Sequence, residues 1–189
     1  MLFSGKNSSP PHFVECSFSR RGRNDKNFIT ESGIHGINYL EFLFGPIRRA
    51  ETDIYEIPGT DGHNRVVNVE FASGVRGIIK FFPFSGNAVE RYEIQGLNYS
   101  AYLYTAQHYT DESESSLTLC RQTVTGKLET TRYGDEDTDP LVRAGFLGEY
   151  EDFFQTVRDS KHVTRSNFMN AWHSQVLAES IEKGVPYRD

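Results

Sequence analysis

Glu31 and His35 are the residues of this chain whose types and spacing favour chemistry. They stand four positions apart, and residues at that spacing are neighbours on a helix. An imidazole has an ordinary pKa near 6.5, so it can take up a proton near neutral pH, and an adjacent carboxylate would stabilise its charged form. The same spacing is also common in solvated surface pairs that have no catalytic role. The spacing alone therefore leaves both interpretations open.

The stretch that carries the pair, residues 31–46, is predicted to be one short helix. Apolar residues recur in it at three- and four-residue steps, which is typical of a core-facing stripe. The stripe consists of Ile34, Ile37, Leu40 and Phe44. Thr30 or Ser32 can cap the start of the helix, and Gly45 followed by Pro46 ends it. Glu31, His35 and Asn38 would then lie together on another face.

The rest of the chain predicts a sheet followed by two helices. Alternating or apolar runs separated by turn residues predict strands over 12–19, 48–57, 66–72, 77–84, 90–96, 99–106, 117–123 and 127–133. Short turns between consecutive strands favour an antiparallel meander. Helical spacing returns over 146–157 and over 168–181, where Ser166 can act as the cap. We therefore expect one α+β domain over 1–189, a large and mainly antiparallel open sheet with three helices on one face.

The face of the sheet that the helices leave uncovered is expected to be rich in aromatic residues, since the chain has 14 Phe and 10 Tyr. An exposed apolar sheet face usually has a partner. A symmetric dimer formed through this face is the simplest arrangement.

Composition excludes several classes of protein. The net charge of −6, without a long basic cluster, argues against a nucleic-acid partner. No run approaches the roughly 18 apolar residues of a membrane span, and the first residues lack a signal-peptide core.

Cys16 and Cys120 lie far apart in predicted strands, which favours buried thiols and a cytoplasmic location. The six histidines show no paired-ligand spacing, so no metal is expected. The acidic loop over 134–140 is compatible with a cation site or, more simply, with a solvated linker.

Several segments together resemble one family. The run from Glu31 to Gly45 (Glu-Ser-Gly-Ile-His-Gly-Ile-Asn-Tyr-Leu-Glu-Phe-Leu-Phe-Gly) is similar to the segment that opens the C-terminal domain of the Gfo/Idh/MocA oxidoreductases. Val67–Gly74 resembles a strand and turn of that domain, and Glu90–Gly96 a strand that ends in its Ile-x-Gly signature. Tyr150–Val157 and Ser166–Ile181 are similar to its closing helices.

The resemblance implies a fold like the glyceraldehyde-3-phosphate dehydrogenase C-terminal domain, which supplies a substrate pocket and an oligomer interface. It implies a sugar, polyol or related CH–OH substrate, and NAD or NADP bound mainly by an N-terminal Rossmann domain. This chain contains no GxGxxG strand–helix unit and no Glu-Lys-Pro segment, which carries the family's catalytic lysine. We therefore expect the chain alone to be inactive and to bind no cofactor.

The resemblance also assigns residues. The acid and histidine of the family fall on Glu31 and His35, with Glu in place of the usual Asp, and a further family Asp falls on Asn38. Arg21, Arg23 and the pair Asn24–Asp25, in the loop before the helix, could bind substrate hydroxyls together with Asn38, although a solvated loop explains them as well. The alternative function is a non-catalytic ligand-sensing or dimerisation module of the same fold.

Overall fold

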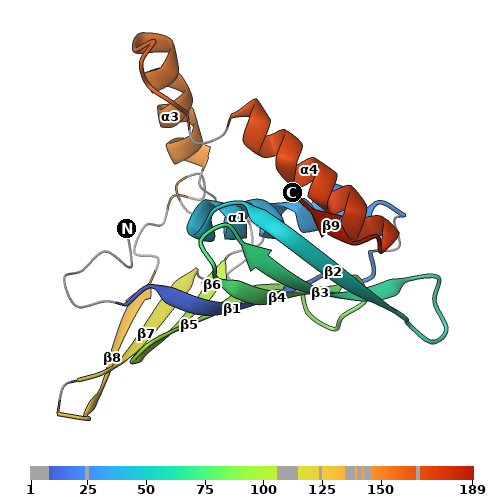
Figure 1. Cartoon of the computed structure of the whole chain (residues 1–189), viewed down its shortest axis with the longest axis horizontal. Helices are drawn as coiled ribbons and strands as arrows, with labels where there is room; N and C mark the ends of the chain where they lie inside the picture. The colour runs from blue at the N-terminus through green and yellow to red at the C-terminus, as the bar shows by residue number, and fades with distance from the viewer. Residues whose placement is uncertain are drawn as a thin grey trace.

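The computed structural model describes residues 9–23, 26–105, 115–123, 125–134, 139, 142, 146–164 and 167–189. Nine strands form one open sheet, and two helical segments pack on one face of it (Figure 1). The predicted class, α+β with a mainly antiparallel sheet, is confirmed. The predicted acidic loop lies almost wholly outside the described residues.

The strands agree closely with the prediction. In chain order they are β1 (Pro11–Ser19), β2 (Ile47–Glu56), β3 (His63–Phe71), β4 (Arg76–Phe82), β5 (Val89–Gly96), β6 (Tyr99–Thr105), β7 (Ser116–Gln122) and β8 (Leu128–Gly134). A ninth strand, β9 (Tyr187–Arg188), was not predicted. It pairs with β2 at the edge of the sheet.

The order of strands differs from a simple meander. It is β8-β7-β6-β5-β1-β4-β3-β2-β9, so β1 lies between β4 and β5 and runs parallel to β4. This insertion joins two antiparallel ribbons, β2–β4 and β5–β8, into one sheet. A central strand is hydrogen-bonded on both sides, and the inward residues of β1, Val14, Cys16 and Phe18, are fully buried.

The helical segment that follows β1 begins with a π-turn, η1 (Ile29–Gly33), and continues as α1 (Ile34–Phe44). The prediction of one helix with an inward apolar stripe is confirmed, because Ile37, Leu40 and Phe44 are buried and Ile34 is partly buried. The helix starts two residues earlier than expected. Neither Thr30 nor Ser32 caps it, since no side chain near the start forms a cap hydrogen bond.

The closing helices are α3 (Phe146–Arg158) and α4 (Phe168–Lys183). Asn167 caps α4, with its Oδ1 accepting a 3.0 Å hydrogen bond from Asn170 N. The expected cap, Ser166, lies outside the described residues. From Ser174 onwards α4 packs against the rest of the domain, and its apolar contacts with the core are made by Leu177, Ala178 and Ile181.

The prediction that three helices cover one face was wrong for α3. None of the α3 residues is buried, and the helix stands away from the sheet in Figure 1. Large apolar side chains on α3 and on the first half of α4 are therefore exposed. They include Tyr150, Phe153, Phe154, Phe168, Met169 and Trp172.

The free face of the sheet is more polar than predicted. Lys80 Nζ lies 2.7 Å from Glu15 Oε1, and Arg91 Nε lies 3.3 Å from Glu93 Oε1. These ion pairs alternate with partly exposed apolar residues such as Ile78 and with Tyr104, which is exposed. The face is a mixed surface rather than an apolar one.

Candidate functional site

His35 lies in the first turn of α1 and is exposed to solvent. Glu31, in the π-turn, and Asn38, one turn further along α1, are exposed as well. The Glu31 carboxylate accepts a long hydrogen bond of 3.4 Å from Asn27 Nδ2. Within the described residues no hydrogen bond or ion pair joins Glu31 to His35. The fold places both side chains at the same end of the helical segment. A direct contact between the Glu31 carboxylate and the His35 ring stays a prediction.

Two glycines allow this helix end to lie directly on the sheet. A Cβ on Gly33 would lie 2.8 Å from Cε1 of Phe81, and a Cβ on Gly36 would lie 3.1 Å from Cδ2 of Phe18. Phe81 and Phe18 belong to the neighbouring parallel strands β4 and β1. The close approach fixes the depth of the helix, and with it the height of His35 above the sheet.

The described part of the predicted substrate loop, residues 21–23, is exposed. Its backbone is tied to the end of β4, because Arg20 N donates to Phe82 O and Arg23 N donates to Pro83 O, both at 2.9 Å. Gly22 occupies the left-handed region with φ +64°. Arg21 and Arg23 are exposed, and Asn24 and Asp25 lie outside the described residues.

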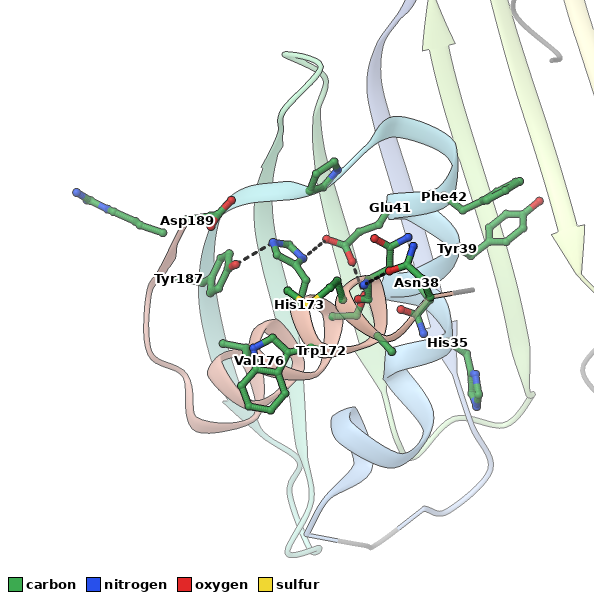
Figure 2. Close-up of a pocket in the computed structure, with 17 residues that line it drawn as sticks. His35, Asn38, Tyr39, Glu41, Phe42, Trp172, His173, Val176, Tyr187 and Asp189 are labelled. Carbon is green, nitrogen blue, oxygen red and sulfur yellow. Dashed lines mark hydrogen bonds and ion pairs between the residues drawn. The ribbon is translucent and has the colours of Figure 1, made fainter. Parts of the chain in front are cut away.

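His35 and Asn38 line one end of an open groove between α1 and α4, with a volume of about 970 Å³ (Figure 2). Trp172 and Tyr187 line it further along, from α4 and β9. The groove contains a polar cluster that sequence reasoning missed. Its members are Glu41, His173, Ser174 and Tyr187.

Glu41 is the centre of this cluster. Its Oε1 accepts a 3.0 Å hydrogen bond from Ile47 N and lies 2.8 Å from His173 Nδ1. The His173 contact has the distance of an ion pair, but the ring N–H is not directed for a hydrogen bond, and Nδ1 has no other partner. The other carboxylate oxygen, Oε2, accepts a 2.5 Å hydrogen bond from Ser174 Oγ. His173 and Ser174 come from α4, more than 130 positions after Glu41 in the sequence, which explains why no local pattern revealed the cluster.

The second ring nitrogen of His173, Nε2, has a hydrogen-bond partner. This nitrogen lies 2.9 Å from the hydroxyl of Tyr187. Burial raises the pKa of Tyr187, and the nearby charges of Asp189 and Glu41 raise it further. The phenol is therefore neutral at physiological pH and can donate to the ring. Because this cluster joins α1, β2, α4 and β9, its evident role is to hold the C-terminal strand in place.

His35 is chemically different from His173. In Figure 2 its imidazole points away from the cluster. In the described part of the chain neither ring nitrogen of His35 has a hydrogen-bond partner, so both remain available to a ligand. An exposed imidazole beside an amide group at a groove can exchange a proton with a bound hydroxyl.

The described residues offer no cradle for a dinucleotide. Such a cradle follows a parallel strand with a glycine-rich turn and a helix N-terminus. Here the single parallel pair, β1 and β4, is not joined by a βαβ unit. In the same part of the chain there is no cluster of three metal-ligating side chains and no helix long and apolar enough to cross a membrane.

The fold resembles one large portion of the chain in several solved oxidoreductases. No protein-family model and no curated protein matches the sequence. Solved structures of oxidoreductases of the Gfo/Idh/MocA type do match it in three dimensions, which confirms the predicted resemblance at the level of the fold.

Three of these structures illustrate the match. Levoglucosan dehydrogenase has a TM-score of 0.70 at 12% identity, with 94% of this chain and 59% of that chain covered. UDP-N-acetylglucosamine 3-dehydrogenase from Acidithiobacillus ferrooxidans has a TM-score of 0.71 at 14% identity, with 95% and 56% covered. A candidate NADPH-dependent oxidoreductase from Desulfitobacterium hafniense has a TM-score of 0.71 at 16% identity, with 95% and 57% covered. The chain thus spans somewhat more than half the length of the proteins it matches.

Proposed function

We propose that this chain is the substrate-binding and oligomerisation domain of an NAD(P)-dependent oxidoreductase of the Gfo/Idh/MocA family. Its substrate would be a sugar, polyol or related CH–OH compound. The observation that carries the proposal is the extent of the structural match, which includes almost the whole chain but only a little over half of each oxidoreductase. Levoglucosan dehydrogenase has been solved with NADH and levoglucosan, which supports the sugar class.

In this proposal His35 is the acid/base residue. Oxidation of a carbinol carbon leaves a hydroxyl that must lose its proton, and the exposed imidazole of His35 would accept it. Glu31 would stabilise the charged imidazole once substrate binding brings the two groups together. Asn38, from the next turn, would hydrogen-bond a neighbouring hydroxyl, since an amide both donates and accepts.

The loop before the helix would complete the substrate site. Arg21 and Arg23 are exposed at its start and can donate hydrogen bonds to sugar hydroxyls. Asn24 and Asp25 would contribute as well. Because Gly22 and the contacts with the end of β4 fix the backbone of the first part of the loop, the side chains of Arg21 and Arg23 start from a defined position.

The cofactor, NAD or NADP, would be bound mainly outside this chain, by a Rossmann domain on the N-terminal side. When bound there, its nicotinamide ring would accept the hydride. The residues described here form no phosphate cradle, so within the proposal this domain supplies substrate binding and proton transfer only. We propose a cytoplasmic location, in keeping with the two free cysteines, Cys16 and Cys120.

Two surfaces of the domain would be covered in the complete enzyme. The large apolar side chains of α3 and of the first half of α4 are exposed, as residues of a docking surface are, and we assign this surface to the nucleotide-binding domain. The free face of the sheet would form the interface between identical copies. Its paired charges and aromatic residues suit a self-complementary contact.

The proposal is tested with the natural protein that carries this chain. Reduction of NAD⁺ and NADP⁺ is measured with a panel of sugars and polyols, for the unaltered protein and for His35→Ala. We expect the unaltered protein to oxidise at least one substrate and His35→Ala to lose most of that rate. The control is His12→Ala, which changes an exposed histidine at the start of β1 and should retain the full rate. A protein that binds a sugar but oxidises none would favour the alternative of a ligand-sensing module.

The isolated chain offers a second test. Calorimetry with NAD⁺ or NADP⁺ is expected to show no tight binding. Tight binding to these 189 residues alone would contradict the assignment of the cofactor to another domain.

A further inference from the structure

The helix that carries His35 is capped from the far end of the chain. The first N–H groups of a helix have no partner within the helix. Here Ile29 N donates a 2.6 Å hydrogen bond to Oε2 of Glu182, in the last turn of α4. No residue near the start of the helix provides a side-chain cap. The negative carboxylate also interacts favourably with the positive end of the helix dipole.

A second residue holds Glu182 in this position. Arg65 Nη2, from β3, lies 2.5 Å from Glu182 Oε1 and donates a 3.1 Å hydrogen bond to the Glu182 backbone carbonyl. The two side chains are only 11% and 14% exposed. Both carboxylate oxygens are thus engaged, one by the guanidinium and one by the helix N-terminus. The direction of the carboxylate is therefore fixed.

The capped residue begins the π-turn. The N–H of Ile34 bonds to the carbonyl of Ile29, five residues earlier, so this turn holds one residue more than an α-turn. Such a turn can relax to regular α-helix, and that change would rotate Glu31 relative to His35. On the sheet side Gly33 is held against Phe81. At the other end of the turn, Ile29 is held by Glu182.

We propose that Glu182 is a positioning residue for His35, acting through Ile29 and the π-turn and supported by Arg65. The catalytic part of this inference rests on the proposed function, whereas the structural part does not. The Glu182–Ile29 contact sets the register of the turn, and the register sets the direction in which Glu31 and His35 leave the helix. Glu182 itself belongs to α4. Its carboxylate contacts the start of the helical segment that carries His35 and touches no reacting group.

The structural part is tested by NMR on the chain itself. In the unaltered chain the Ile29 amide is expected to exchange as slowly as the core amides of β4, whereas the first amide of an uncapped helix exchanges rapidly. Glu182→Ala should accelerate Ile29 exchange about tenfold or more, relative to Ile79, and should shift the His35 ring resonances. Glu182→Gln keeps the volume, but both carboxylate oxygens accept from donors, so the amide NH2 group must face either Arg65 or Ile29 N. This variant should therefore act in the same direction, and it covers the case in which the alanine variant fails to fold.

Glu179→Gln is the matched control. Glu179 lies one turn earlier on α4, where it forms an exposed pair with Lys183. This variant should leave Ile29 exchange and the His35 resonances unchanged. Rapid Ile29 exchange in the unaltered chain, or His35 resonances that do not move in Glu182→Ala, would overturn the inference.

The catalytic part is tested in the natural enzyme. Glu182→Gln should lower kcat about tenfold with KM changed less than twofold, because the substrate contacts remain while the proton acceptor is misplaced. If His35→Ala abolishes turnover but Glu182→Gln leaves kcat unchanged, the positioning role is wrong and the proposed function stands. If His35→Ala has no effect, the proposed function falls, whatever the NMR shows.

Discussion

The carboxylate of Glu182 accepts a hydrogen bond from Ile29 N, a residue 153 positions earlier in the chain. The contact joins the last helix of the domain to the start of the helix that carries the candidate acid/base residue. It makes the C-terminal helix part of the structure that presents the site. The ion pair behind it, with Arg65, is largely shielded from solvent.

Removing Glu182 should reduce stability strongly. Glu182→Ala leaves the guanidinium of Arg65 without its carboxylate in a buried position, and breaking such a pair typically costs about 3–5 kcal/mol. Urea unfolding followed by circular dichroism measures the change in the free energy of unfolding. The exposed Glu179→Ala should cost less than about 0.5 kcal/mol. Equal, small losses for the two variants would show that the Arg65–Glu182 pair is not buried in solution.

Gly33→Ala should destabilise the domain because of its contact with the sheet. The new methyl group would lie 2.8 Å from the ring of Phe81, closer than a carbon contact permits. Forcing an extra methyl into a packed interface costs about 1–3 kcal/mol, measured as a lower thermal midpoint. Gly148→Ala is the control, since nothing lies within 4 Å of its added Cβ, and it should leave the midpoint unchanged or raise it. A Gly33→Ala variant as stable as the parent would contradict the close approach of the helix.

The buried thiol of Cys16 should make stability fall in alkaline solution. Burial, reinforced by the charges of Glu90 and Glu15, raises its pKa well above the ordinary value. Above about pH 8.5 the unfolded chain loses this proton while the native chain keeps it, so the free energy of unfolding falls by up to about 1.4 kcal/mol per pH unit. Below that pH the contribution is fully present.

Variants at the two cysteines check the source of this slope. Unfolding by urea is measured between about pH 8 and 9, below the ordinary tyrosine pKa near 10, so that tyrosine ionisation in the unfolded chain adds little. Cys16→Ala should remove most of the slope. Cys120→Ala should retain it. The same slope in both variants would mean that another group is responsible.

The single tryptophan reports on the patch assigned to the cofactor domain. Trp172 is 57% exposed on α4. In the isolated chain its fluorescence should resemble that of tryptophan in water and should be quenched readily by acrylamide. In the complete enzyme the emission should shift to the blue and the quenching should weaken. Emission that is already blue and protected in the isolated chain at low concentration would contradict the exposed patch.

The strands and the stripe of α1 could be predicted from sequence because they depend on local patterns. Alternation along β3 and β4, and turn residues such as Gly74, define strand ends without knowledge of the partner strand. The parallel insertion of β1 could not be predicted, since nothing local to β1 identifies β4 as its neighbour. The isolated position of α3 was missed because an apolar stripe indicates burial but not against which surface.

The candidate site divides in the same way. Glu31, His35 and Asn38 share one segment, so the prediction that they lie at one end of one helix could be made from their spacing. The contacts of Glu41 with His173 and Ser174, and the cap at Ile29, join residues more than 100 positions apart. Such contacts leave no local pattern. The π-turn also escaped prediction, because it is stabilised by the sheet and by Glu182 rather than by its own residues.

The rate of nucleotide reduction by the natural protein, with and without the His35 imidazole, decides whether this residue transfers the proton. With a sugar or polyol that the unaltered protein oxidises, His35→Ala should lower kcat by about 10²–10⁴-fold, the usual contribution of a general acid/base. Circular dichroism and the unfolding midpoint should be unchanged, because the His35 side chain is exposed and forms no hydrogen bond within the described residues. A His35→Ala protein that turns over at the full rate would remove His35 from the mechanism and contradict the proposed function.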